Sequence, residues 1–393
     1  CVRGDAGSMS AKVPTRGSSS DEIQFSRTKT VVFSVVSVLL GLLVLEGICA
    51  VIWIMIVPDR FEGHADAPVR FGMVNWPDIV EKDPWLFWQL KANSTAPLDR
   101  GKMTGFIANG DHMRNPEGPV ERGSNDFRVL CLGDSNTFGC GVRYEEAYPT
   151  VLAELLREAF PDREIHVMNA GCSGYSAHQG LEILQRRGLK YRPDVVTIWF
   201  GWNDKAYWDG MTDAEHARLF ARERRLTSSF TYRVLSYTLR RASHDEVREE
   251  REETESRQRR MPLADYEARL RDMVELTRAN EIIPGSGSVG RAVIIQGCKI
   301  KHLRKLLGET EDATGFNRWL KATAKVAEEL EVPMLSVCDV LLEAGLGPDV
   351  FLDRGHLDPR GLRALAEALF ALLAEHDMLP DPVAEPAAKA ARR

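Results

Sequence analysis

The stretch DFRVLCLGDSNTFG, residues 126–139, joins a short apolar run to a glycine-containing turn and then to the start of a helical pattern. Its apolar part, residues 127–132, has the length and composition of a strand that is buried on both faces of a sheet. Ser135 lies on the turn, just beyond this strand. Reacting groups in an open parallel sheet gather beyond the carboxyl ends of the strands, so the segments after the other strands must supply any partner of Ser135.

The rest of the chain alternates short apolar runs with helical patterns. We predict further strands at residues 165–168, 195–200, 292–296 and 334–337. This alternation predicts an α/β fold with three layers, α/β/α, around a parallel sheet. Three intervals have apolar residues at helical spacing: Val151, Leu152, Leu155, Leu156 and Ala159; Phe316, Trp319, Leu320, Val326, Ala327 and Leu330; and Leu362, Leu365, Ala366, Leu369, Leu372 and Leu373.

Residues 205–290 interrupt the alternation with charged sequence of helical pattern. Acids and bases nearly balance within residues 241–260, which is typical of a solvated helix or a mobile loop. We therefore predict a domain at residues 126–378 that carries a helical insertion at 205–290, and this insertion can form a cap beside the active site. Residues 379–393 are predicted to be a disordered tail.

Residues 58–125 are rich in Pro, Gly and Asp and have few periodic runs. We predict a juxtamembrane linker followed by a loop-rich lead-in to the domain. Its aromatic residues indicate that part of it packs on the core, and these residues are Trp76, Trp85, Phe87 and Trp88.

The N-terminal region contains a long apolar segment. Residues 31–57 are apolar except for Ser34, Ser37 and Glu46, and the segment exceeds the roughly 20 residues needed to cross a bilayer. A cleaved signal peptide has a shorter apolar region of about 7–15 residues, so we predict a retained transmembrane helix at 30–57. Glu46 is costly at mid-membrane unless it is protonated or paired, so either a partner helix satisfies it or a single anchor tolerates it.

The flanking charges predict the orientation of this helix. Arg3, Lys12, Arg16, Arg27 and Lys29 precede it, whereas only Arg60 and Arg70 lie in residues 58–77 after it. The positive-inside rule then predicts that residues 1–29 are a disordered cytoplasmic tail. The rest of the chain is predicted to lie on the extracytoplasmic, periplasmic side of the cytoplasmic membrane.

The composition of the chain excludes some classes of function. The chain is 44% hydrophobic and 27% charged, as in ordinary globular proteins, and its formal net charge of -6 lacks the basic excess of a nucleic-acid-binding protein. The stretch GSGSVG at 285–290 matches a dinucleotide fingerprint, but it precedes a predicted strand instead of following one. We expect no cofactor, no metal and no nucleic acid, and the sequence identifies no protein partner.

The seven cysteines are scattered, and none of them forms a CxxC pair. The odd number argues against a dense disulfide framework, so small buried thiols are expected. Cys140 and Cys172 lie just beyond the first two strands, and outside the membrane they can alternatively pair across the rim of the site.

Polar blocks follow the other strands. NAGCSG at 169–174 offers glycine N–H groups close to a substrate, and GWND at 201–204 offers the side-chain amide of Asn203. Near the C-terminus, DRGH at 353–356 places a carboxylate three residues before an imidazole. Asp353 can hold one ring nitrogen of His356 and fix its tautomer, while the other nitrogen faces Ser135.

Together, the four blocks resemble in order and spacing the SGNH (GDSL-like) hydrolase superfamily, which is named for its Ser, Gly, Asn and His. The resemblance covers roughly residues 126–375 and implies a flavodoxin-like α/β/α fold. It implies Ser135 as nucleophile, His356 as general base and Asp353 as the residue that orients the imidazole. It also implies an oxyanion hole formed by the N–H groups of Ser135 and Gly174 and by Asn203. The first block reads GDSN instead of GDSL, but that fourth position contributes no catalytic group.

The resemblance implies a serine esterase without a cofactor. The lead-in, with Asn109-Gly110 and Asn115-Pro116, resembles membrane-anchored bacterial relatives that are associated with surface polysaccharides. We therefore expect an acyl ester substrate, an O-acetyl group on a surface glycan or exopolysaccharide, with the acyl group passed to water or to a sugar hydroxyl. The alternatives are a lipid-directed lysophospholipase or thioesterase, and a non-catalytic glycan-binding or assembly component. Trp202 lies within the third block and Trp208 lies shortly after it, so both border the site loop, where they can stack on a sugar, line an acyl pocket or simply pack.

Overall fold

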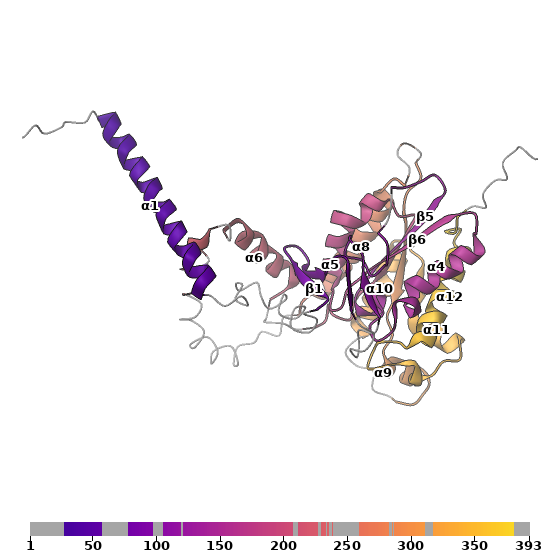
Figure 1. Cartoon of the computed structure of the whole chain (residues 1–393). Coiled ribbons are helices and arrows are strands. Elements are labelled where there is room, and N and C mark those ends of the chain that lie inside the picture. The colour runs from indigo at the N-terminus through magenta and orange to yellow at the C-terminus, as the bar shows by residue number, and fades with distance from the viewer. Residues whose placement is uncertain are drawn as a thin grey trace, which may run out of the picture.

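The computed structural model describes residues 27–56, 78–96, 105–118, 121–206, 211–226, 229–232, 234–235, 238, 259–282, 285, 287–310 and 317–380 (Figure 1). Some sequence predictions lie outside these residues. They are the cytoplasmic tail up to residue 26, the linker at 57–77 with Arg60, Arg70 and Trp76, Trp208, most of the charged stretch 241–260, and the tail from residue 381.

Five parallel strands form the central sheet in the order β6-β5-β7-β8-β9. This is the flavodoxin-like order, and each strand matches one of the predicted apolar runs. The register pairs Gly133 at the end of β5 with Gly171 of β6 and Trp199 of β7, so the carboxyl ends of these three strands meet at one edge. The strands are β5 (Asp126–Gly133), β6 (Glu164–Gly171), β7 (Val195–Trp199), β8 (Arg291–Gln296) and β9 (Met334–Ser336).

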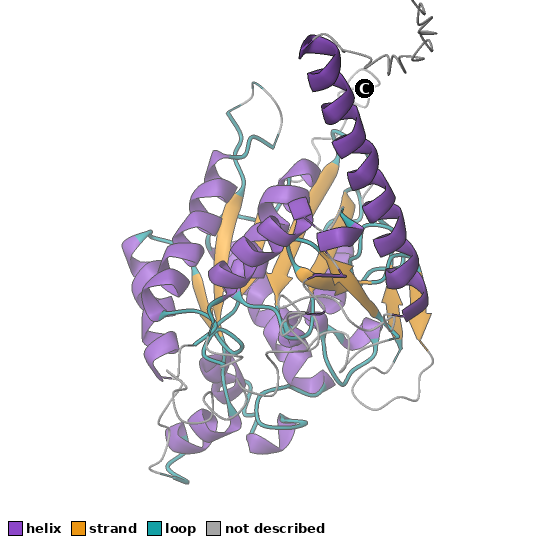
Figure 2. Cartoon of the chain, turned by 90° about the vertical axis from the view of Figure 1, so that its left-hand side faces the viewer, coloured by secondary structure: helices purple, strands orange, loops and turns teal. Residues whose placement is uncertain are grey.

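Helices cover both faces of this sheet (Figure 2). Alternate residues of β5 separate the two cores: Leu130 and Leu132 pack in one cluster, whereas Val129 and Cys131 pack in the other. The first cluster contains α5 (Ala177–Ile183), α8 (Leu263–Ala279) and α10 (Asn317–Glu329), and the second contains α4 (Tyr148–Ala159) and α12 (Pro359–Glu375). The predicted three-layer α/β/α class is therefore confirmed.

Shorter helical segments connect these elements. They are α3 (Ser135–Phe138), η2 (Tyr144–Glu146), η3 (Leu184–Gly188), η4 (Leu189–Tyr191), α9 (Ile300–Leu306), α11 (Val337–Glu343) and η5 (Pro348–Val350). The interval predicted as an insertion contains α6 (Asp213–Leu226) and also α8. Because α8 packs against β7 and β8, the second half of that interval belongs to a layer of the sheet.

Two hairpins precede the sheet in the lead-in segment. β1 (Val80–Asp83) pairs with β2 (Phe87–Leu90), and β3 (Ser94–Ala96) pairs with β4 (Phe106–Ala108). Phe87 and Trp88 are fully buried in the same cluster as α5 and α8, so this part of the lead-in is continuous with the core.

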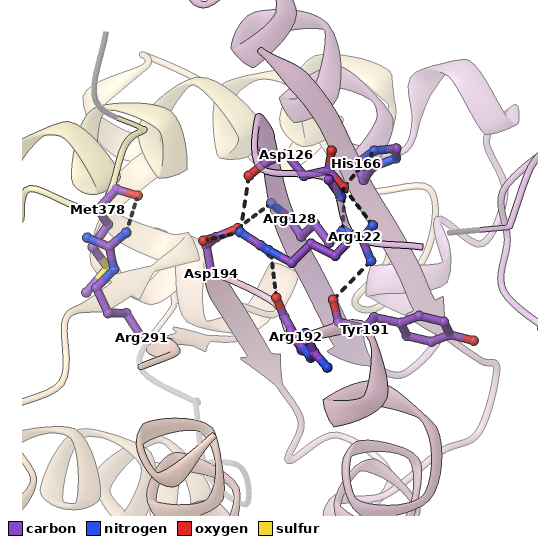
Figure 3. A network of polar contacts seen from close by, with 10 residues as sticks. Arg122, Asp126, Arg128, His166, Tyr191, Arg192, Asp194, Arg291 and Met378 are labelled. Carbon is purple, nitrogen blue, oxygen red and sulfur yellow. Dashed lines mark hydrogen bonds and ion pairs between the residues drawn. The ribbon is translucent and has the colours of Figure 1, made fainter. Parts of the chain in front are cut away.

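The opposite edge of the sheet, at the amino ends of the strands, is held by a polar network (Figure 3). Arg128 is buried at the start of β5 and pairs with Asp126 at 2.6 Å. Its backbone N–H donates to Asp194 over 2.7 Å, and Arg122 pairs with the same carboxylate at 2.9 Å. These contacts fix the amino ends of β5 and β7 relative to each other.

The first helix, α1 (Arg27–Ile56), projects from the rest of the chain on the side of α6 (Figure 1). It is long and apolar enough to cross a membrane over Arg27–Ile52, with a mean hydropathy of 2.7. Glu46 has partners in this structure: it accepts hydrogen bonds from the side chains of Ser229 and Thr231, at 2.9 and 2.8 Å. The partner is thus a segment of the same chain.

Candidate active site

Ser135 lies at the carboxyl end of β5, as the first residue of α3. Asp134 caps this short helix and accepts the backbone N–H of Asn136 over 2.9 Å. A Cβ atom on Gly133 would lie 2.0 Å from the hydroxyl of Thr137, so only glycine allows the turn to fold this tightly against the sheet. Ser135 is 5% exposed and is therefore almost completely buried.

His356 and Asp353 come from the loop before α12 and reach Ser135. Nε2 of His356 lies 2.7 Å from Oγ of Ser135. Nδ1 of His356 lies 2.9 and 2.8 Å from the two carboxylate oxygens of Asp353. The structure thus brings together the hydroxyl, imidazole and carboxylate that the sequence predicted, although Ser135 and His356 are 221 residues apart.

The carboxylate of Asp353 also shapes the loop. Its Oδ1 accepts the backbone N–H groups of Gly355 and His356, at 2.9 and 3.0 Å. The backbone N–H of Leu352 donates to the carbonyl of His356 over 2.9 Å, and this bond closes the loop. His356 is therefore held both through its imidazole ring and through its backbone.

The predicted oxyanion-hole residues lie around the same point. Asn203 follows β7, and its amide donates to Oδ2 of Asp134 over 3.2 Å and to the carbonyl of Tyr175 over 2.9 Å. Gly174 has a φ of +83°, in the left-handed region that favours glycine. The turns after β5, β6 and β7 therefore converge at one edge of the sheet.

Two buried aspartates stabilise these turns. Burial raises the pKa of Asp134, which is 1% exposed. Burial also raises the pKa of Asp204 to about 7, although its oxygens accept the N–H groups of Ala177 and Gly201 over 2.8 Å each. Asp204 links the turn after β7 to the start of α5.

A cationic cluster that the sequence analysis missed lies beside His356. The ammonium group of Lys299 lies 3.7 Å from the ring centre of Trp202, and that of Lys205 lies 4.8 Å from it. A Cβ atom on Gly355 would lie 2.6 Å from the same indole, so Trp202 packs directly on the loop of His356. Lys299 follows β8 at the site edge of the sheet, and inspection of the segment after the fourth predicted strand would have found it.

Burial lowers the pKa of Lys299 to about 6, and the neighbouring charge of Lys205 adds to this effect. The indole of Trp202 attracts an ammonium ion, but this attraction is smaller than the opposing contributions. Lys299 therefore changes charge near pH 6.

The cysteines are arranged differently from the rim pairing considered from the sequence. Cys140 and Cys172 are both buried and are not joined by a disulfide bond, and burial raises the pKa of Cys172 to about 12. The disulfide bond joins Cys298, after β8, to Cys338 in α11. Neither cysteine carries a sequence signal for this pairing, because it depends on the adjacency of β8 and β9. Among the residues that the structure describes, no group of three or more His, Cys, Asp or Glu side chains is placed to hold a metal.

A Ser-His-Asp arrangement at the carboxyl edge of a parallel α/β/α sheet is characteristic of serine hydrolases. The chain belongs to the GDSL-like lipase/acylhydrolase family, whose model matches residues 131–364. It is therefore a carboxylic ester hydrolase, and the predicted resemblance and enzyme class are confirmed. No curated protein matches the chain significantly in sequence.

Solved structures with similar folds include three hydrolases. An acetylxylan esterase from Geobacillus stearothermophilus is 18% identical over 63% of this chain and 94% of its own, with a TM-score of 0.40. An α/β hydrolase from the metagenome of Lake Arreo, Spain, is 18% identical over 65% of this chain and 98% of its own, with a TM-score of 0.41. A lipase/acylhydrolase from Enterococcus faecalis is 19% identical over 64% and 95%, with a TM-score of 0.37.

Proposed function

We propose that this chain is a membrane-anchored serine esterase that acts outside the cytoplasmic membrane on an O-acyl ester, such as an O-acetyl group, of a surface glycan or exopolysaccharide. The observation that carries the proposal is the contact of 2.7 Å between Oγ of Ser135 and Nε2 of His356, with Nδ1 of the same ring bonded to Asp353. This geometry supports Ser135 as the nucleophile, His356 as the general base and Asp353 as the orienting carboxylate.

The proposed reaction has two steps. His356 takes the proton of Ser135 as the serine oxygen attacks the ester carbonyl, and the resulting oxyanion is bound by the N–H groups of Ser135 and Gly174 and by the amide of Asn203. For this, the Asn203 amide exchanges its longer bond, the one to Asp134, for a bond to the oxyanion. His356 then protonates the departing alcohol. Water, or a sugar hydroxyl in the transferase variant, gives its proton to His356 and attacks the acyl-serine, which restores the free hydroxyl.

The proposed location rests on two independent features. The helix α1 is long and apolar enough to span a bilayer, and basic residues are more frequent before it than after it. The bond between Cys298 and Cys338 is of the kind that forms and persists in oxidising compartments such as the periplasm. Both features favour a catalytic domain on the extracytoplasmic side.

The proposed polar substrate rests on the rim of the site. Trp202 lies beside the loop of His356 with two ammonium groups near its ring, at 3.7 and 4.8 Å. A half-buried indole among polar groups suits the flat face of a sugar and its hydroxyls better than it suits an alkyl chain. The residues at the rim of the site thus favour a glycan substrate over a lipid substrate.

The test of the proposed activity uses the full chain in detergent. We expect a fluorophosphonate probe to label the parent, and we expect p-nitrophenyl acetate to be hydrolysed much faster than the decanoate ester. Ser135→Ala should abolish both reactions, and acetate release from an acetylated polysaccharide should follow the same pattern. Preference for the decanoate ester would support a lipid-directed enzyme, and absence of labelling on folded parent would support a binding protein.

The test of topology is a reporter fusion. Alkaline phosphatase fused after residue 380 should be active in a bacterial host, because this reporter folds only in the periplasm. A green fluorescent protein fused at the same point should stay dark when exported through the general secretion route. The opposite pattern would place the domain in the cytoplasm and contradict the proposed location.

A further inference from the structure

The loop after β6 carries Gly174, and three consecutive carbonyl groups of this loop accept hydrogen bonds from side chains far away in the sequence. One donor, Asn203, already belongs to the predicted site, whereas the other two have no role in the proposed reaction. The three pairs are Trp88 Nε1 to Ser173 O at 3.1 Å, Arg260 Nη1 to Gly174 O at 2.7 Å, and Asn203 Nδ2 to Tyr175 O at 2.9 Å.

The bond from Trp88 acts on the peptide group that carries the Gly174 N–H. The carbonyl of Ser173 and the N–H of Gly174 belong to one planar trans peptide, so they point in opposite directions. Because Trp88 holds the carbonyl toward β2, the N–H of Gly174 must point away from that strand. A hydrogen bond to the carbonyl also polarises the same peptide and makes its N–H a stronger donor.

The bond from Arg260 acts on the following peptide, which begins at the carbonyl of Gly174. With both flanking peptides held, φ and ψ of Gly174 are fixed, at a positive φ that glycine adopts without strain. Without these two bonds the freedom of glycine would let the N–H turn away from its direction. Two side chains from different parts of the chain thus restrain one flexible residue.

The guanidinium of Arg260 is itself firmly held. It is 1% exposed and bonds both carboxylate oxygens of the fully buried Asp213, at 3.1 and 3.0 Å. It also donates to Oε1 of Gln179 over 3.0 Å, and Gln179 in turn accepts the N–H of Ser176 over 2.9 Å. A buried bidentate pair of this kind cannot swing without leaving a charge unpaired.

The same loop also contacts the turn of Ser135. The backbone N–H of Cys172 donates to the carbonyl of Gly133 over 3.3 Å, and the amide of Asn203 bridges Tyr175 to Asp134. β2 and the residues just before Ser135 therefore both contact this loop. The peptide that Trp88 holds directs the Gly174 N–H away from β2.

We infer that Trp88 and Arg260 are positioning residues of the oxyanion hole, which fix the two peptide groups on either side of Gly174 and thereby aim its N–H at the oxyanion. This inference rests on the proposed function, in which Gly174 is an oxyanion donor. It assigns a role in the reaction to the lead-in hairpin, through Trp88, and to the interval between β7 and β8, through Arg260 and Asp213.

The inference predicts a specific kinetic effect. Removal of one oxyanion donor lowers kcat by about 10²–10³-fold, so a misdirected donor should lower it by about tenfold or more. KM should change by less than about twofold, because the donor bonds the transition state more strongly than the ground-state carbonyl. The apparent pKa in the pH profile of kcat/KM should not move, because the imidazole and its carboxylate are untouched.

The experiment measures kcat and KM for p-nitrophenyl acetate with the full chain in detergent, and the rates are normalised to the folded fraction. Trp88→Phe removes the indole N–H and keeps an aromatic ring, and Arg260→Met removes the guanidinium. Arg260→Lys should give an intermediate kcat, because an ammonium can reach one acceptor but cannot bond a carboxylate through two N–H groups.

Arg128→Met is the matched control, because Arg128 is also 1% exposed and paired to a buried aspartate, but at the opposite edge of the sheet (Figure 3). It should lower Tm and leave kcat of the folded protein within about twofold of the parent. Unchanged kcat in both Trp88→Phe and Arg260→Met, or an equal loss in Arg128→Met, overturns the inference alone. A parent without activity that depends on Ser135 overturns the proposed function, and the inference with it.

Discussion

At the scale of single residues, Asp353 contacts both the backbone of its loop and the imidazole that it is proposed to orient. Its Oδ1 accepts two backbone N–H groups, and both oxygens lie within 2.9 Å of Nδ1 of His356. An asparagine keeps an acceptor for the backbone, so the loop survives the change. Its N–H₂ group, however, meets Nδ1 as a donor and leaves the ring proton on Nε2, facing Ser135.

We therefore expect Asp353→Asn to lower kcat by about 10²–10⁴-fold with little change in Tm, because the wrong tautomer cannot accept the serine proton. Steady-state kinetics and thermal unfolding of the same preparation check this expectation. Asp353→Ala should lower both kcat and Tm, because it also removes the backbone acceptor. If Asp353→Asn kept nearly full activity, the orienting role assigned to Asp353 would be wrong.

Lys299 gives a pH-dependent prediction at the same scale. Its native pKa of about 6 lies well below the ordinary value near 10.5. Between these two values the unfolded chain binds a proton that the native chain does not, so the contribution of Lys299 to stability falls as the pH drops from about 10.5 to about 6. Lys299→Met removes the titrating ammonium group and, with it, this pH-dependent contribution to stability.

The gain in stability from Lys299→Met, relative to the parent, should accordingly be larger at about pH 6.5 than at about pH 9.5. Denaturant unfolding of both proteins at the two pH values measures the difference, and titrations common to both proteins cancel in it. A gain that is equal at both pH values, or larger at the higher one, would show that the native pKa of Lys299 is not lowered.

At the scale of elements, the lead-in hairpins are part of the folded core. Val80, Phe87, Trp88 and Leu90 are each at most 2% exposed. Arg114, which follows β4, is fully buried and donates to the carbonyls of Gly139 and Val142, over 2.8 Å each. Removing this segment would expose apolar surface and take the guanidinium donors away from those carbonyls.

We expect a chain that starts at residue 77 to unfold cooperatively, and a chain that starts at residue 126 to lose its sharp transition. The reason is that the shorter chain lacks the buried side chains of the two lead-in hairpins and the buried guanidinium of Arg114. Near-ultraviolet circular dichroism during heating distinguishes the two outcomes. A sharp transition of equal Tm in the shorter chain would show that the hairpins add little to the core.

The disulfide bond ties two elements at the edge of the sheet. Cys298 follows β8, Cys338 begins α11 after β9, and the sequence separation is 40 residues. Closing a loop of this length restricts the unfolded chain by about 4 kcal/mol in the chain-entropy account. Cys298→Ser with Cys338→Ser should lower the free energy of unfolding by up to this amount, and a reducing agent should lower that of the parent only. Equal responses of both proteins to the reducing agent would contradict the pairing.

At the scale of the whole molecule, α1 is joined to the catalytic domain by more than the polypeptide. Glu46 accepts hydrogen bonds from the backbone N–H groups of Phe230 and Thr231 and from the hydroxyls of Ser229 and Thr231. These N–H groups belong to the first residues of a helical stretch, where backbone donors lack partners within their own helix. Cys49, one turn after Glu46, is 7% exposed, whereas most of α1 is exposed.

Glu46→Ala should therefore release this stretch from α1 and increase amide hydrogen exchange at residues 229–235, with exchange in β5 and β7 unchanged. Glu46→Gln, which keeps one acceptor oxygen, should show a smaller increase. Hydrogen exchange of the detergent-solubilised full chain measures both variants. No difference from the parent at residues 229–235 would show that the contact with α1 does not hold this segment.

The sequence by itself determined where along the chain the five strands of the central sheet and the helices α4, α10 and α12 lie, and which residues form the predicted triad. These features are local, because burial on two faces produces continuous apolar runs and the reactive side chains directly follow these runs. The turn of Ser135 can be predicted from the sequence for the same reason, because the glycines that it requires, Gly133 and Gly139, lie within a few residues of it. The N-terminal apolar helix is likewise a property of one continuous segment.

Only the tertiary structure decided which distant groups meet. The contacts of Trp88 and Arg260 with the Gly174 loop, the pairing of Cys298 with Cys338, and the position of Lys299 against Trp202 each join residues that are 40 or more positions apart. Side-chain periodicity reports only whether a residue faces a core, and not which residue lies across from it. The partner is set by strand order and register, which arise when the whole sheet assembles.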